Sequence, residues 1–275
     1  MNSESEIAIR NQPGVPAIRS VNWGGLRALY VKEVRRFFKV QLQTIWAPAL
    51  TTLLYLVIFT VALGGTKKEV LGASFPDFLA PGLIIMGMMQ NAFANSSFSL
   101  LVGKIQGTIV DYLMPPLSTA EVLFGLAGAA VTRAILVGLT IWGAMLFWPG
   151  VHVAPQHGWA ILLFGILGSS MLAFMGVLTS IWAEKFDHAA AVANFVVAPL
   201  ALLSGTFYAV DRLAPTFAAI SHANPFHYAI SGFRYGFIGQ ADIPLGFGVV
   251  LLIAINLALG GVCYALLKTG WKIKS

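Results

Sequence analysis

Charged residues are scarce in this chain of 275 residues. Aspartate, glutamate, lysine and arginine make up 10% of it and hydrophobic residues make up 57%, whereas soluble domains carry about 25% charged residues. This composition excludes a soluble globular protein. The net charge is +6, but basic residues alternate with aromatic ones only in the segment 22–40. The charge therefore does not indicate nucleic-acid binding.

Cysteine is almost absent as well. Cys263 is the lone cysteine, which excludes an intrachain disulfide.

Residues 1–20 lack an apolar core, so we expect no cleavable signal peptide. We expect residues 1–21 to form a flexible cytoplasmic tail and residues 22–275 to form a single membrane domain. The first span would then direct insertion itself.

Motifs for catalysis and nucleotide binding are missing too. The chain has no G-x-x-x-x-G-K-[ST] loop for ATP, no H-E-x-x-H and no G-x-S-x-G. The pairs His152/His157 and His222/His227 lack further metal ligands. Carboxylates occur near the ends of the apolar runs, and no internal repeat is visible. A lipid-modifying membrane enzyme and a secondary carrier are therefore disfavoured alternatives. We expect no cofactor and no metal in this chain.

Long apolar runs are what the chain does have. Runs beyond about 18 residues indicate transmembrane helices. The sequence predicts an all-α integral membrane protein with six spans, at residues 44–63, 78–101, 122–147, 159–182, 189–208 and 245–267.

Two further helical segments are predicted outside these spans. Residues 22–40 have an apolar stripe at steps of three or four and a basic remainder, which is typical of an amphipathic helix in the membrane interface. The segment 211–239 holds the apolar pieces 217–220 and 226–238, interrupted by prolines. A helix of about 12 residues reaches only about 18 Å against a hydrocarbon core of about 30 Å. These pieces predict a re-entrant hairpin on the outer side, with the residues Pro215, Phe217, Pro225, Phe226 and Phe233.

The distribution of lysine and arginine predicts the orientation. If both termini are cytoplasmic, twelve of the 17 basic residues lie inside and four lie outside. The remaining basic residue, Arg133, falls within the third span. Its candidate partners are Glu121 and Asp111, which lie on the cytoplasmic side of that span. Such a bias favours both termini inside. The segment 103–120 is then cytoplasmic, and the hairpin faces out.

The cytoplasmic segment 103–120 is semi-polar and lies between two spans. Ile105, Ile109, Leu113 and Leu117 recur every four residues, which predicts one apolar helical face, and Pro115-Pro116 ends the helix. Lys104 and Asp111 fall elsewhere on that helix. Such a helix is a weak membrane anchor, but it suits docking to another protein. An ordinary loop on the lipid headgroups remains an alternative.

Polar side chains inside the spans are few and are concentrated in the second span. They predict either a substrate path or hydrogen bonds between helices. The candidates for the path are Gln90, Asn91, Asn95, Asn194 and Ser204.

Three blocks of sequence resemble the ABC-2 type permeases, the membrane subunits of bacterial ABC exporters. The resemblance is greatest to the branch that contains the nodulation-factor exporter permease. The blocks are GTIVDYLMPPLS at 107–118, LSGTFY with DRL at 203–213, and NPFHY with GFRYG at 224–236.

The resemblance implies a function and partners. It implies a permease homodimer in the bacterial inner membrane, with one ATPase subunit contacting each copy and binding ATP and Mg²⁺. The segment 104–117 would be the coupling helix, whose contact residues would be Lys104, Ile105, Ile109, Asp111, Leu113 and Leu117. The substrate, a lipid, a glycan or an amphipathic drug, would pass between the two copies.

Overall fold

The computed structural model describes residues 21–62, 69–148, 150–210 and 213–273, except for the side chain of Leu113. Within these ranges the regular secondary structure is helical apart from a two-stranded hairpin, β1 (Glu69–Val70) and β2 (Ala73–Ser74). The prediction of an all-α membrane protein is confirmed at this level.

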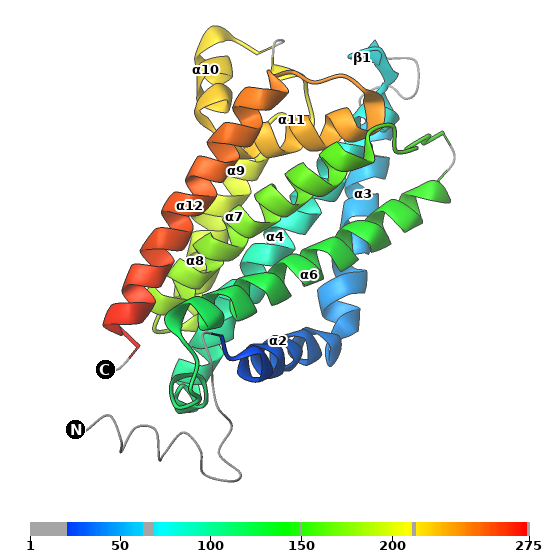
Figure 1. Cartoon of the computed structure of the whole chain (residues 1–275). Helices are drawn as coiled ribbons and strands as arrows, with labels where there is room; N and C mark the ends of the chain where they lie inside the picture. Colours follow the sequence, from blue (N-terminus) through cyan, green and yellow to red (C-terminus); the bar gives the residue numbers. More distant parts are fainter. Residues whose placement is uncertain (1–20, 63–68, 149, 211–212, 274–275) are drawn as a thin grey trace, which may run out of the picture.

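A bundle of long helices forms the body of the molecule (Figure 1). Four apolar segments are long enough to cross a membrane: η1 with α3 (Leu42–Trp46 and Ala47–Ala62), α6 (Thr119–Leu146), α7 (Gly158–Trp182) and α12 (Leu245–Thr269). Two more segments run with them. These are the longer but more polar α4 (Phe75–Ile105), and the shorter run of α8 (Phe186–Val192), η3 (Ala193–Val197) and α9 (Ala198–Leu202).

Helix α4 is the central helix of the bundle, and most of its residues are buried. It packs mainly against α7 and α6. The approach of α7 depends on Gly176, because a Cβ there would lie 2.6 Å from the carbonyl oxygen of Phe93. A side chain at this position would force the two helices apart.

Helices α2 and α11 close the two ends of the bundle. At one end α2 (Trp23–Phe38) lies across the bundle and packs against α6, near the end of α12 (Figure 1). At the other end lie α10 (Pro215–Ala223) and α11 (Pro225–Ile238), each of which begins at a proline. Proline suits the first helical position, because its missing N–H would have no partner there.

Helix α9 ends earlier than the sequence predicts. The run 189–208 was expected to be helical throughout, but α9 stops at Leu202, and Gly205 adopts φ +77°. Side chains of α10 and α11 bond the carbonyl oxygens that follow: Ser221 donates to Leu203 (2.9 Å) and Arg234 donates to Gly205 (2.7 Å). The chain therefore turns here and is held against α10 and α11.

The predicted hairpin residues differ in burial. Phe226 and Phe233 are buried among the helices, whereas Phe217 is 53% exposed. Pro215 and Pro225 are the first residues of α10 and α11. The segment is therefore helical as expected, and most of its aromatic residues serve internal packing.

Candidate functional site

The tip between α4 and α6 contains two separate helical pieces. Helix α4 ends at Ile105, and Gly107 then adopts φ +72°. The amide of Thr108 donates to the carbonyl of Gly103 (2.8 Å), which closes the end of α4 in the manner of a glycine C-cap. Only one further turn follows, α5 (Val110–Leu113). The prediction of one continuous helix over 104–117 is therefore wrong, whereas the coupling role of the segment stays a prediction.

This break changes which side chains are exposed. Ile109 and Leu117 are half-buried and pack against a core cluster that includes Leu29 of α2. Ile105 is 43% exposed, as a docking residue would be. The side chain of Leu113 lies outside the described part of the structure. The predicted single helical face of Ile105, Ile109, Leu113 and Leu117 does not form, because the helix is interrupted at Gly107, between the first two of them.

Two apolar side chains that the sequence pattern missed project from the tip instead. Val110 is 48% exposed and Met114 is 78% exposed. We name the exposed set Ile105, Val110 and Met114 the tip patch. Asp111 is exposed beside it. The position of Met114 just before Pro115-Pro116 was the available sequence signal, because proline ends a helix and leaves the residue before it at the helix end.

Lys104 has a role within the chain. Its Nζ donates to the carbonyl oxygens of Ser180 (3.2 Å) and Ile181 (2.8 Å) and also to that of Ala183. It therefore caps the C-terminal end of α7, where a cation also suits the helix dipole. Burial lowers the pKa of Lys104, and the nearby carboxylate of Glu184 opposes this effect.

A buried carboxylate lies directly behind the tip. Glu33 of α2 is 0% exposed. The hydroxyl of Tyr112 in α5 donates to its Oε1 (2.8 Å), and the hydroxyl of Ser99 in α4 donates to its Oε2 (2.8 Å). Burial, and then the charge of Glu33, raise the pKa of Tyr112, so the phenol stays protonated and remains a donor.

Arg36 completes this cluster. Its Nη2 lies 2.8 Å from Oε2 of Glu33 and donates to the backbone oxygen of Asn95 (2.9 Å) and to Ser99 (2.9 Å). We name Glu33, Arg36, Asn95, Ser99 and Tyr112 the buried polar cluster. It joins α2, α4 and α5. Glu33 stands on the apolar face of α2, four residues from both Leu29 and Phe37, and a carboxylate on such a face is the sequence signal for it.

A second carboxylate fixes the start of α2. Glu121 accepts from the backbone amides of Ser118 (2.6 Å) and Asn22 (2.5 Å), and Ser118 in turn caps α6. Glu121 thus joins the start of α2 to the start of α6 beside the tip.

Two grooves follow the polar side of α4. One, of about 320 Å³, runs between α3 and α4 and is lined by Gln43, Thr51, Thr52, Tyr55, Gln90 and Asn91 among others. The other, of about 200 Å³, runs between α4 and the α8–η3–α9 segment and includes Gln90 and Asn194. Each groove touches a π-helical turn, η1 or η3, and such turns are frequent at functional sites. No charged side chain lines either groove among the described residues.

The five candidates for the substrate path therefore divide. The structure places Gln90, Asn91 and Asn194 on the grooves. Asn95 and Ser204 are 0% exposed. Asn95 belongs to the buried polar cluster, and the hydroxyl of Ser204 donates to the carbonyl of Ala201.

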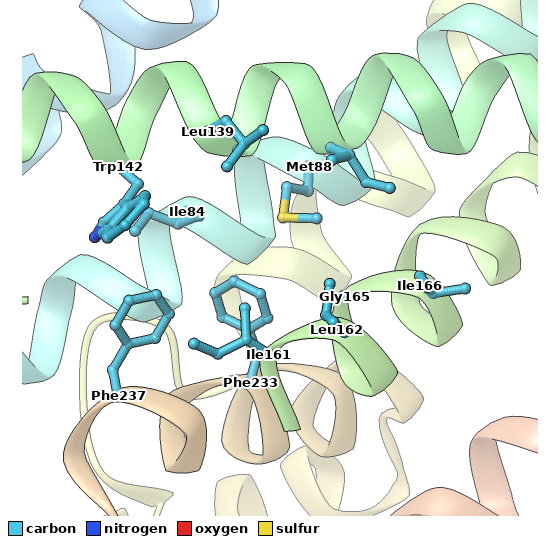
Figure 2. Close-up of a pocket in the computed structure, with 12 residues that line it drawn as sticks. Ile84, Met88, Leu139, Trp142, Ile161, Leu162, Gly165, Ile166, Phe233 and Phe237 are labelled. Carbon is cyan, nitrogen blue, oxygen red and sulfur yellow. The ribbon is translucent and has the colours of Figure 1, made fainter. Parts of the chain in front are cut away.

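A third cavity, of about 90 Å³, lies between α6 and α7 and has only apolar and aromatic lining side chains. Figure 2 shows Met88 and Ile84 of α4 on one side and Phe233 and Phe237 of α11 on the other. It offers no group that would recognise a polar ligand. Among the described residues there is also no group of three or more metal-ligating side chains.

The comparisons with known proteins identify the class. Residues 25–238 match the ABC-2 type transporter family, and the chain belongs to that family. The resemblance seen in the sequence is thereby confirmed. The chain is a transport permease with membrane-spanning helices, which favours transport over the enzymatic alternative.

Individual relatives agree with this class. The chain is 34% identical over 256 residues to the "Inner membrane transport permease YadH" of Escherichia coli (strain K12), which covers 92% of this chain and 98% of the relative. It is 27% identical to "Nodulation protein J" of Rhizobium leguminosarum bv. viciae, which covers 84% and 91%. A "Nodulation protein J" of Rhizobium meliloti is 23% identical and covers 90% of each chain.

Proposed function

We propose that this chain is the permease subunit of an exporter and that ATP is hydrolysed on separate ATPase subunits. The assembly contains two copies of the permease and two ATPases, which bind ATP and Mg²⁺. The permease is catalytically inactive and moves its substrate across the membrane. Family membership and a relative named as an inner membrane transport permease support this proposal.

We also propose six spans, with both termini in the cytoplasm of a bacterial inner membrane. The four apolar spans are joined by α4 and by the α8–η3–α9 segment, which run alongside them in the bundle. Helix α2 then lies at the cytoplasmic surface, and α10 and α11 lie in the outer leaflet. The excess of lysine and arginine on the proposed inner side supports this orientation.

The tip patch is the observation that carries the coupling proposal. Ile105, Val110 and Met114 expose apolar surface next to α2, at the end of the bundle that would face the cytoplasm. Burial of a valine or methionine side chain contributes about 1.5–3 kcal/mol. A few such side chains in a cleft of the ATPase would dominate a small contact. Behind the patch, Tyr112 connects it to Glu33.

The substrate path follows the two grooves beside α4. In a dimer these grooves would face the second copy, and Gln90 lines both of them. Amide and hydroxyl groups in an otherwise apolar wall suit an amphiphile with a polar head. The proposed cargo is therefore a lipid, a lipid-linked glycan or an amphipathic drug.

Co-purification with the ATPase subunit tests the coupling proposal. The variants Val110→Asp and Met114→Asp place charge in the tip patch, and we expect each to reduce the captured ATPase at least tenfold, because a buried unpaired charge is costly. Gln106→Asp is the control, since Gln106 is exposed in the turn before α5. Full capture of the ATPase by the combined Val110→Asp, Met114→Asp variant would refute docking at the tip.

A further inference from the structure

Arg133 is a cation in the interior of an apolar span. It lies near the middle of α6, and the residue is 9% exposed. The described residues form three ion pairs, and Arg133 takes part in none of them. Neither Glu121 nor Asp111 meets it, although the sequence allowed both. A cation at such a depth is costly unless it has a partner, and charged groups in membrane spans commonly mark a substrate pathway.

The contacts of Arg133 leave its charge uncompensated. Its Nη2 donates to Oδ1 of Asn91 (2.8 Å), and its Nε is buried without a hydrogen-bond partner. The nearby cation Arg36 is already paired with Glu33. The interior between α4 and α6 therefore holds one net positive charge.

Asn91 is the link between this charge and the groove of about 320 Å³ between α3 and α4. It lines the groove, and Arg133 lies directly behind it. Gln43, Gln90 and Tyr55 add neutral polar groups along the same wall, and no carboxylate lines it among the described residues. Neutral donors backed by a buried cation suit an anionic, oxygen-rich group.

We propose that the α3–α4 groove binds the anionic head of an amphiphilic substrate, such as a phosphate or carboxylate, and that Arg133 determines this charge specificity. This inference rests on the proposed export function and narrows its substrate class. The acyl or other apolar part would remain among the exposed apolar side chains of α3, which include Leu50 and Leu54. Arg133 is thus a specificity residue that acts through Asn91.

Binding to the purified permease, without ATPase or ATP, tests the inference. The two ligands are fluorescent short-chain phosphatidylglycerol and phosphatidylcholine with the same acyl chains, followed by fluorescence polarisation in a nonionic detergent. We expect the wild-type protein to bind the anionic lipid about tenfold more tightly. Equal binding of the two lipids would overturn the inference. Glycerol phosphate is the competitor without acyl chains. If it competes as strongly as the intact lipid, the proposal that the groove selects an amphiphile is refuted.

Asn91→Asp is the decisive variant. It places a carboxylate on Arg133 and neutralises the charge in place, while the contact between α4 and α6 is kept or strengthened. A merely structural role for Arg133 predicts no loss of anion preference. Our inference predicts that the preference disappears in Asn91→Asp and in Arg133→Gln, and that Arg133→Lys retains most of it.

Arg27→Gln is the matched control for a basic residue elsewhere. Arg27 lies on the basic side of α2 with Arg35 and Lys39. If this variant abolishes the preference while Asn91→Asp retains it, the lipid binds at α2 and the inference is refuted. Because the assay contains no ATPase, a failure of ATPase docking would leave its outcome unchanged, so the two proposals fail separately.

Discussion

Glu33 shows how one side chain can connect the tip to the membrane part of the molecule. It is fully buried, and it accepts hydrogen bonds from α5, α4 and its own helix, α2. A buried carboxylate is stable only when partners replace the lost water. Here Tyr112, Ser99 and Arg36 do so, and they come from three different helices.

Glu33→Gln tests this connection at the scale of the residue. The change leaves Arg36 without its ion-pair partner and turns one carboxylate oxygen into an amide donor inside the buried polar cluster. Arg36 is 30% exposed, so we expect a cost of about 3 kcal/mol, the low end for a broken buried pair. The midpoint of thermal unfolding should then fall by roughly 6–10 °C.

Arg27→Gln is the control in the same helix, since Arg27 has no ion pair among the described contacts. Its unfolding midpoint should stay close to that of the wild type. Equal midpoints for Glu33→Gln and the wild type would show that the buried polar cluster does not hold α2, α4 and α5 together.

At the scale of the element, hydrophobicity and periodicity identified the membrane helices, because burial in lipid demands long apolar runs. They misplaced the ends of two elements for a common reason. Gly107 and Gly205 both adopt positive φ, and the apolar pattern continues through both positions although the backbone does not. Tyr112 and Ser99, the partners of Glu33 on other helices, and Asn91, the partner of Arg133, were also beyond the reach of the sequence, because only the fold brings these helices together.

Gly107→Ala tests the turn that separates α4 from α5. An added Cβ would meet open space, so its cost comes from the left-handed backbone alone, about 1–2 kcal/mol. We expect faster amide hydrogen exchange at residues 108–112, measured by mass spectrometry, and weaker capture of the ATPase. Gly261→Ala is a matched control, since Gly261 also faces open space but lies within helix α12. If the amides of residues 108–112 exchange at the wild-type rate in both variants, the structure of the tip does not depend on the turn at Gly107.

At the scale of the whole molecule, polar contacts connect the tip with the central helix. They run from Tyr112 through Glu33 and Arg36 to Asn95 and Ser99, on the helix that also lines both grooves. Helix α4 packs against α6 and α7 over much of its length. A push on the tip would therefore reach the proposed substrate path through one rigid helix, and α10 and α11 would respond at its far end.

The central claim is that the tip patch touches an ATPase, and photo-cross-linking measures this contact directly. The photoreactive residue p-benzoylphenylalanine is placed at Met114, which is 78% exposed, or at Phe247, which is 56% exposed at the opposite end of the bundle. Both positions are illuminated in the intact membrane assembly while it hydrolyses ATP. Our account predicts a covalent product with the ATPase from Met114 and none from Phe247. The absence of a product from Met114, or an equal yield from Phe247, would contradict it.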